Sequence, residues 1–531
     1  MPAPERSQNI QEVQLKVVGG NKFGRYPKIS VEQTWNFIVS DNALVPYAGY
    51  KNVLNVGGTN VGRDIFSSIP GNLMLGVWGS QVFVISTALV ATFVGSLTTT
   101  TGDVFIEENN NQEIAITDGV HIYVYNWGSG LFSTSDVTPG FTLPVGLDNP
   151  GYISFQNGRL IVVDTDSSNW YLGKFNDALT WTGTGTYIGA LQSKPDRVQA
   201  AVPTPGGGNN LCLFGHAVVE QWQDIGAATF PYQRSSTFNV DFGCLNASSI
   251  AALDTYIVWL SASETSGATV MIINGSNAKS ISTDGLDFKL AELTNPTNCT
   301  GFLFRQDGHV IYQFCFPDDN LSYALDLNTN LFFTVTDERL NYHPARNVVF
   351  FNDNYYFVSL KNPNLFLFDT TITDIDYGND EVFELPRLRI APPLRLPSQR
   401  MYIIKSLGFT IENGQPNIPT TITTFTGMLD DLATEDSFDI TTEDGDLIAL
   451  DGGADSSNTS IYYSEAVDLS ISRDGGESWG NAERQYMNPI GKRTSRFIFQ
   501  RLGQANDASP QLRFSGFGRF VAFDGVVEVY V

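Results

Sequence analysis

The chain has 531 residues, of which 42% are hydrophobic, so it can bury a large core divided among two or three domains. Its formal net charge of −25 argues against a general nucleic-acid-binding protein, because such proteins neutralise phosphates with Lys and Arg. The 49 glycines and the lack of any long amphipathic helical pattern favour short strands and turns, and therefore an all-β protein.

The first 70 residues are assigned to an N-terminal arm and the leading strands. The opening residues MPAPERSQNIQEVQ lack a cationic start followed by an apolar segment, so no secretory signal is expected. Residues 72–97 are uncharged, but glycines and hydroxyl residues interrupt them at near-alternating spacing. Buried strands explain this stretch better than a membrane-spanning helix, and no membrane insertion is expected.

A turn followed by an apolar strand recurs through the first two thirds of the chain. The repeated strands start near Gln81, His121, Arg159, Leu211, Tyr256, His309 and Tyr355. Their spacing of about forty to fifty residues is typical of one four-stranded propeller blade. The pattern predicts a β-propeller over residues 71–375, with seven blades favoured and six as the alternative.

A short proline-rich stretch separates the repeat from the rest of the chain. Residues 376–400 include LPRLRIAPPLRLPSQR, whose prolines cannot donate to a central strand, so we expect an extended connector. Its arginines, Arg387, Arg389, Arg395 and Arg400, either brace an interface or are solvated linker charges, and the second explanation is the commoner one. Residues 401–531 are expected to form a C-terminal β domain of the sandwich or barrel type.

The C-terminal domain carries an acidic insertion at residues 428–457. No Lys or Arg occurs between Lys405 and Arg473, and near-repeated octads place acids in turns between short apolar pairs. The candidate acidic channel or insertion surface comprises Asp430, Asp431, Glu435, Asp436, Asp439, Glu443, Asp444 and Asp446. These carboxylates lack the ligand spacing of an EF-hand, so solvated turns are favoured over calcium and no cofactor or metal is expected.

The string ISRDGGESWG at residues 471–480 looks like the Asp box of glycan-cutting propellers. In that motif Ser472 and Asp474 satisfy backbone groups of a hairpin, Gly476 lies in the turn and Trp479 packs against it. The box occurs once and outside the repeat, and it lies away from the catalytic arginines and tyrosine of a sialidase. We therefore interpret it as structural, and no catalytic residue or enzyme activity is expected.

The cysteines and histidines also give no indication of a catalytic or metal site. The four cysteines are scattered without CxxC spacing, so they are expected to be small buried residues rather than a disulfide framework or zinc site. The four histidines lie in different repeats, and no Walker loop, GxSxG elbow or dinucleotide glycine pattern occurs.

Several strings resemble the packaged-DNA stabilisation, or tail hub and nozzle, proteins of short-tailed bacteriophages. They are FGRYPKISVEQTWNFIVSDNALVPYAGYKNV near the start, VVEQWQDIGAATFPYQR and FGCLNASSIAALDTYIVWLSAS in the middle, and SISRDGGESWGNAERQYMNPIGKRTSRFIFQRLG near the end. Residues at the family's blade-to-blade positions are Glu220, Trp222, Phe230, Pro231, Arg234, Gly243, Cys244 and Ser249. The resemblance covers nearly the whole chain in order and fails at the acidic insertion.

This resemblance implies a structural virion protein of the phage tail, assembled in the cytoplasm of the bacterial host. It implies a ring, expected to be a homohexamer, that lies below the portal and adaptor, continues the DNA channel and retains packaged DNA without sequence-specific binding. Tail fibres or spikes and a plug or needle would be further partners. The alternative is a glycan-binding or glycan-cleaving propeller that acts as a receptor-binding tail component at the host surface.

The charge distribution adds two hypotheses about this assembly. The acids of the insertion would line a channel wall to which DNA does not adhere. A set of basic residues would dock the C-terminal domain against an acidic neighbour, either the adjacent subunit or the adaptor, with solvated strand charge as an equally good explanation. That set comprises Arg484, Lys492, Arg493, Arg496 and Arg501.

Overall fold

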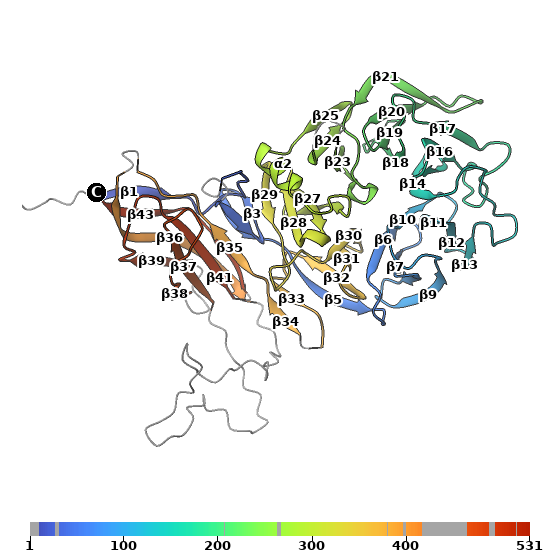
Figure 1. Ribbon diagram of the computed structural model, residues 1–531. Coiled ribbons are helices and arrows are strands. Elements are labelled where there is room, and N and C mark those ends of the chain that lie inside the picture. Colours follow the sequence, from blue (N-terminus) through green and yellow to red (C-terminus); the bar gives the residue numbers. More distant parts are fainter. Residues whose placement is uncertain are drawn as a thin grey trace, which may run out of the picture.

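A computed structural model describes residues 10–26, 31–206, 208–262, 267–379, 381–396, 400–416, 465–487, 494–516 and 518–531. Within these residues the chain is almost entirely β, with one short helix, α2 (Asp284–Ala291), and two single turns of 3-10 helix, η1 (Ala247–Ser249) and η2 (Pro317–Asp319). Figure 1 shows a disc of small sheets beside a second, elongated body of longer strands. The all-β prediction is confirmed.

Six four-stranded blades of the disc are consecutive in sequence, and each is an antiparallel meander. The first three are β6–β9 (Gly62–Ser68, Leu73–Trp78, Gln81–Ile85, Ala91–Ser96), β10–β13 (Phe105–Glu108, Glu113–Thr117, Ile122–Asn126, Leu131–Thr134) and β14–β17 (Pro150–Gln156, Arg159–Asp164, Asn169–Leu172, Tyr187–Ala190). The next three are β18–β21 (Val198–Pro203, Asn210–Gly215, Val219–Asp224, Tyr232–Val240), β22–β25 (Ala251–Leu253, Tyr256–Ser261, Thr269–Asn274, Asn277–Ser280) and β26–β29 (Thr300–Gln306, His309–Phe316, Leu321–Asp326, Leu331–Thr334).

The tight turns of these meanders follow from their residue types. Asn157 and Gly158 join β14 to β15 with φ angles of 49° and 81°, and Asp307 and Gly308 join β26 to β27 with φ angles of 48° and 86°. Two successive positive φ angles suit the right-handed twist of the flanking strands, and Asn-Gly and Asp-Gly adopt them readily. The local sequence therefore sets the strand pairing within a blade.

A further four-stranded unit closes the ring from two distant parts of the chain. The strands β30 (Ala345–Phe351), β31 (Asn354–Ser359) and β32 (Asn364–Asp369) are completed by β5 (Gly49–Asn55), which pairs antiparallel with β32. β30 and β31 then contact β6 of the first blade. The blades that are contiguous in sequence number six, which is the alternative count of the prediction, and this composite unit closes their ring.

The predicted start of the propeller at residue 71 is too late. Both β5 and β6 precede it, in the residues assigned to the arm and leading strands. β5 lies about three hundred residues before the strand that it joins, so it shows no local repeat, and it supplies the fourth strand that the last unit needs.

The second body is a β-sandwich formed by both ends of the chain. One sheet has the order β1 (Ile10–Leu15), β43 (Gly525–Tyr530), β36 (Tyr402–Pro416), β42 (Gly518–Ala522), β4 (Ala43–Pro46), β3 (Phe37–Ser40), with β39 (Thr494–Gln500) and β40 (Gln504–Ala505) also paired to β36. The other has the order β2 (Gln33–Trp35), β35 (Arg387–Ile390), β41 (Ser509–Ser515), β37 (Ala466–Ser472), β38 (Glu483–Tyr486). It continues the β26–β29 blade through a parallel pair of Trp35 and Thr334.

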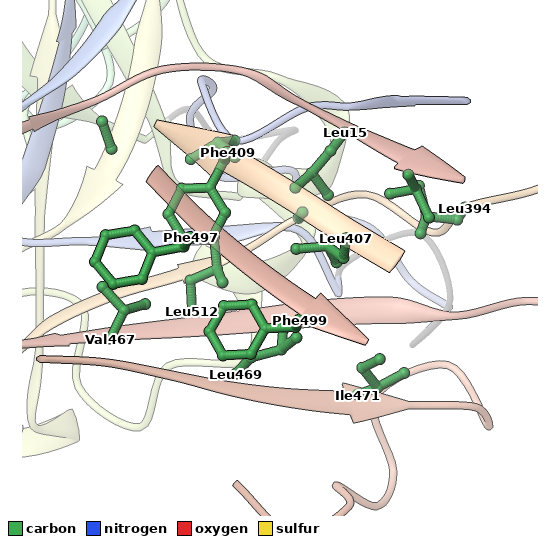
Figure 2. Packing of buried hydrophobic residues seen from close by; sticks show 14 of the residues in the cluster. Leu15, Leu394, Leu407, Phe409, Val467, Leu469, Ile471, Phe497, Phe499 and Leu512 are labelled. Atoms are coloured by element: carbon green, nitrogen blue, oxygen red, sulfur yellow. The ribbon is translucent and has the colours of Figure 1, made fainter. Parts of the chain in front are cut away.

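The sandwich core lies between these two sheets. Figure 2 shows Phe409, Phe497 and Phe499 of one sheet directed at Leu469 and Leu512 of the other. In β39 every second residue is buried, which is the pattern of a strand with one face on a core. Each such side chain contributes about 1.5–3 kcal/mol on full burial, so this body has a substantial core of its own.

Residues 382–384 and 387–390 of the expected extended connector at 376–400 are instead built into the sheets. β33 (Asp374–Asp376) and β34 (Val382–Glu384) extend the closing unit, and β35 is an interior strand between β2 and β41. The prolines do not prevent this, because Pro386 and Pro392 flank β35 and need not donate within it. Arg387 and Arg389 are fully buried rather than solvated, whereas Arg400 is exposed.

A buried histidine lies between the β26–β29 blade and the closing unit. His343 is 1% exposed and packs edge-on against Tyr50 at 5.2 Å between ring centroids. Its Nδ1 accepts a hydrogen bond from the Ala345 N–H at 3.3 Å. Burial, together with the nearby Lys361 ammonium, lowers the pKa of His343 to about 3.

This pKa predicts acid sensitivity. Between about pH 6.5 and pH 3, His343 is protonated in the unfolded chain but stays neutral in the folded protein. The free energy of unfolding therefore falls as the pH drops from about 6.5 towards 3. We expect His343→Gln to flatten this dependence by up to about 1.4 kcal/mol per pH unit in urea unfolding at pH 4 to 6. An unchanged slope would contradict the assignment, and His121→Gln at a partly exposed position is the matched control.

Candidate functional site

The inner strands of the propeller enclose a small cavity on its axis. The cavity has a volume of about 130 Å³ and is lined from β6, β10, β14, β26, β30 and η1. It can hold only a few water molecules, since each occupies about 30 Å³ in the liquid. DNA therefore cannot pass along the axis of a single propeller.

Two arginines brace this axis across the ring. Arg63 donates to the carbonyl oxygens of Gly79 and Thr99, each at 2.9 Å. Arg346 donates through Nε to the carbonyl oxygen of Arg63 and through a terminal nitrogen to Asp103 Oδ1 at 2.6 Å. Although burial opposes the shift, the Arg346 charge and hydrogen bonds lower the pKa of Asp103. The network joins the first, second and closing units of the ring.

Two further carboxyl groups that line the cavity have raised pKa values. Burial raises the pKa of Asp64 to about 6, although its Oδ1 accepts a hydrogen bond from the Asn347 side chain at 2.7 Å. Burial raises the pKa of Glu107 to about 8. Sequence reasoning missed these residues, because each lies in a short strand without a motif, and only the fold brings the two strands to one cavity.

We expect Glu107→Gln to stabilise the protein at pH 7 to 9. The folded protein favours the neutral form of Glu107, because its pKa is raised to about 8. The contribution of this group to the free energy of unfolding is therefore complete below about pH 4.5 and is lost as the pH rises to about 8. Glutamine resembles the neutral acid and does not ionise, so the free energy of unfolding at these pH values should rise by about 2 kcal/mol. Thermal unfolding at pH 5 and pH 8 tests this, with Glu477→Gln on the surface as control. An equal effect at both pH values would contradict it.

The middle string of the resemblance forms the joint between the third and fourth blades. Glu220 is completely buried, and its carboxylate accepts hydrogen bonds from the Gln192 N–H at 2.9 Å and the Trp222 indole at 3.0 Å. Arg234 Nε lies 3.6 Å from the same carboxylate. Phe230 packs edge-on against Trp222 at 6.3 Å. These contacts hold the outer part of one blade against the next.

The next joint depends on a glycine. A Cβ on Gly243 would lie 2.1 Å from backbone atoms of His216, so no larger residue fits. The Gly243 carbonyl accepts a hydrogen bond from the Trp259 indole at 2.9 Å, and Cys244 is buried beside Ser249. All four cysteines are buried.

The Asp-box string forms a compact hairpin after β37. The Ser472 hydroxyl donates to Asp474 Oδ1 at 2.7 Å and accepts from the Gly476 N–H at 2.8 Å. Asp474 Oδ1 also accepts the N–H groups of Glu477 and Ser478, each at 3.0 Å. Hydrogen bonds from Ser478, above all, hold the pKa of Asp474 well below its usual range. These bonds are internal to the turn, and Trp479 is half-buried.

Three of the five predicted docking residues lie in the described part of the chain. Arg484 makes a bidentate pair with Asp468 of the neighbouring strand, at 2.7 and 2.8 Å, so its charge is already matched. Arg496 and Arg501 are exposed, and neither has a carboxylate partner within the part of the chain that the structure describes. Lys492 and Arg493 lie outside the described residues. So do all eight acids of the predicted acidic surface, Asp430, Asp431, Glu435, Asp436, Asp439, Glu443, Asp444 and Asp446.

The two sheets of the sandwich are linked at their edges by Gln485 of β38. Its side-chain amide donates to the Ile498 carbonyl at 2.8 Å and accepts the Ile498 N–H at 3.3 Å. The amide side chain thus makes, at Ile498 of β39, the two backbone hydrogen bonds that a neighbouring strand would make. This link gives the sandwich its barrel-like closure.

Metal-binding clusters and membrane-spanning helices are both absent from the described part of the chain. Among the described residues, no group of three or more His, Cys, Asp and Glu side chains converges as a metal site. No helix of the described part is long and apolar enough to cross a bilayer.

Several solved structures are similar in arrangement to this chain at low sequence identity. Streptogramin B lyase matches with a TM-score of 0.41 and 12% identity, over 61% of this chain and 97% of that one. Virginiamycin B lyase from Staphylococcus aureus matches with a TM-score of 0.39 and 12% identity, over 68% and 99%. The N-terminal domain of Nup159 matches with a TM-score of 0.38 and 10% identity, over 64% and 99%. Likenesses this weak carry no functional argument.

No curated protein sequence matches the chain. A family profile described as "Bacteriophage P22 Gp10, beta-propeller" matches residues 30–373. The matched range begins just before β2 and ends after β32, so it takes in the closing strand and every blade. Because this range is more than half of the chain, the protein belongs to the phage stabilisation family typified by bacteriophage P22 Gp10.

Proposed function

We propose that this protein is a structural component of a bacteriophage tail that assembles as a ring, continues the DNA channel below the portal and adaptor, and helps to retain the packaged DNA. The observation that carries the proposal is the family match across the whole propeller. The protein acts by binding its neighbours and needs no enzymatic turnover. A location in the virion tail follows from this role.

The geometry of the propeller supports a ring of subunits. Since the axial cavity of one propeller is too small for DNA, a channel must run between copies of the chain. Six copies around a common axis would provide it, as a closed cyclic assembly does. The net charge of −25 per chain would repel the phosphates of the passing duplex, so that DNA slides rather than adheres.

Arg496 and Arg501, together with Lys492 and Arg493, remain the proposed contacts to an acidic neighbour, which is either the adjacent subunit or the adaptor. Arg484 would have to leave Asp468 to take part, so we propose that it braces β38 instead. Fibres or spikes and a plug or needle would occupy other faces of the ring.

Electron microscopy of particles made without this protein tests the proposal. We expect heads without DNA that lack the lower tail, and restoration of both by a complementing copy. Full heads with a complete tail channel that fail to adsorb would overturn it and would favour the receptor-binding, glycan-recognising alternative.

Charge reversal tests the docking residues separately. We expect R496E combined with R501E to reduce incorporation into particles about tenfold or more, because like charges at an interface are strongly unfavourable. Quantitative mass spectrometry of purified particles measures this. The control is Lys279→Glu on the outer strand of a blade, and equal incorporation of both variants would show that the arginines are merely solvated.

A further inference from the structure

The outer strands of the propeller differ in how their edges are protected. β29 pairs with β2 and β5 pairs with β33, so these two edges are covered. β21 carries Arg234 and β25 carries Lys279. β9, β13 and β17 are each paired on one side only, and none of them contains a charged residue or a proline. Because charges and prolines are the usual protection of a free edge, these three neighbouring edges are unprotected.

Each of these three strands also exposes a large apolar side chain. Phe93 of β9 is 52% exposed, Leu131 of β13 is 66% exposed and Ile188 of β17 is 56% exposed. Val137 and Val145 are exposed in the connector of residues 135–149, which follows β13. Figure 1 shows β9, β13 and β17 on the side of the disc that is remote from the second body. We call these three strands and the connector the distal rim.

Exposed apolar side chains are concentrated in this half of the propeller. The described residues between 62 and 197 include nine large ones, among them the five of the distal rim. The described residues between 198 and 334, a stretch of almost equal length, include one, Ile225. Single exposed side chains of this kind are normal on a surface, whereas a concentration of them marks a site of interaction. The distal rim is therefore a surface that a partner covers.

The same part of the chain lacks positive charge. Residues 64–158 contain eight Asp and Glu residues and no Lys or Arg. Asp136 and Asp148 are exposed in the connector, and neither makes an ion pair within the described residues. A partner of the distal rim must therefore bring apolar side chains together with positive charge.

The opposite end of the same chain meets this requirement. Residues 473–531 contain eight Lys and Arg residues and six Asp and Glu residues, whereas the whole chain has 31 basic and 56 acidic residues. The described part of this stretch includes β38 to β43 of the second body. Tyr486 and Val526 are exposed on these strands. This end therefore offers the charge that the distal rim lacks, together with apolar side chains.

The two surfaces lie at opposite ends of the molecule, so they can meet only between copies of the chain (Figure 1). A contact between two distal rims would bring acidic residues together without any Lys or Arg from residues 64–158, and like charges at an interface are strongly unfavourable. The favoured contact is therefore heterologous. Heterologous contacts repeat from copy to copy and close into a ring where the rotation permits.

We propose that the distal rim binds the end of the second body that β38 to β43 form, in an adjacent copy of the chain. This contact rests on the ring proposed above, and it identifies the two surfaces through which neighbouring subunits meet. Phe93, Leu131 and Ile188 become buried, and the free edges of β9, β13 and β17 are covered. The acidic neighbour of Arg496 and Arg501 is then the adjacent subunit rather than the adaptor.

Photo-cross-linking in purified particles tests this contact. p-Benzoylphenylalanine in place of Leu131 should give a product of two copies, linked to residues 473–531 and several-fold more abundant than the product from the same group in place of Ile225. Ile225 is the matched control, because it is 52% exposed but lies outside the distal rim. A product no more abundant than at Ile225, or one linked to another virion protein or to a blade of a second copy, would overturn the proposal.

The sign of a charge placed on the distal rim gives a second readout. Leu131→Lys and Leu131→Glu remove the same apolar contact, but only the lysine opposes a basic neighbour. We expect L131K to reduce incorporation into particles about tenfold or more, and several-fold more than L131E does. Ile225→Lys should leave incorporation unchanged, and thermal unfolding of the free chains confirms that each variant folds. Equal incorporation of L131K and L131E would overturn the proposal.

The failure of this contact can be distinguished from the failure of the tail function. Particles made without the protein that keep a complete tail channel would remove the ring itself. A cross-link from position 131 to another virion protein would leave the chain in the tail and would change only the partner of the distal rim.

Discussion

Replacing Arg389 with leucine is expected to destabilise the protein by about 3–5 kcal/mol, because it breaks a buried ion pair and leaves the Glu32 carboxylate with only the exposed Lys22, at 3.0 Å, as a charged partner. The guanidinium is completely buried and lies 2.7 Å from Glu32 Oε1. It also donates to the Val17 carbonyl at 2.7 Å and to the Thr34 hydroxyl at 2.9 Å. One side chain of β35 thereby fastens the N-terminal strands into the sandwich.

The matched control is Arg395→Leu, five residues beyond β35. Arg395 pairs with Asp507 at 2.8 Å but is half-exposed, so its loss should change stability by less than about 1 kcal/mol. Urea unfolding of both variants measures the difference. If the two shifts were equal, the N-terminal strands would be held by their backbone pairing and apolar packing alone. Glu32→Gln together with Arg389→Leu should recover part of the loss, since it removes the stranded charge.

The blades could be predicted from the sequence because they are local. The recurrent strands near Gln81, Arg159 and His309 are β8, β15 and β27, one in each of three blades, and tight turns such as Asn157-Gly158 join neighbours in sequence. β5 could not be found in this way, since its partner β32 lies about three hundred residues away. β35 could not be predicted either, because its flanking prolines and alternating arginines are typical of a linker. Its ion-pair partner Glu32 lies more than three hundred residues away in the sequence.

The candidate sites also divide into those built from local contacts, which could be predicted, and those built from distant residues, which could not. The hairpin of Ser472 and Asp474 could be predicted, because all of its hydrogen bonds join residues within a few positions. The network of Arg63 and Arg346 on the propeller axis could not be predicted. Arg346 donates to Asp103 and to the Arg63 carbonyl, which are more than two hundred residues away in the sequence. Arg484 was predicted as a docking residue on charge alone, and only the pairing of β37 with β38 reveals Asp468 opposite it.

Replacing Tyr50 with alanine is expected to destabilise the propeller by about 3–5 kcal/mol, because it leaves a cavity in the strand that closes the ring. Tyr50 is completely buried in β5 and packs edge-on against Phe357 at 5.4 Å and Phe366 at 5.2 Å. In the register it lies opposite Phe368 of β32 and beside Ile375 of β33. The loss therefore weakens contacts on both sides of the closing strand.

Val53→Ala, on the same strand but partly exposed, should cost less than about 1.5 kcal/mol. Thermal unfolding compares the two, and limited proteolysis between β5 and β6 should be faster only for Tyr50→Ala, because a loosened β5 exposes that loop. A propeller without its closing strand has a free edge at β32, which would favour non-native pairing between copies. Equal effects of the two substitutions would instead mean that the ring is held shut by the contact of β30 and β31 with β6, with β5 serving only to join the two bodies.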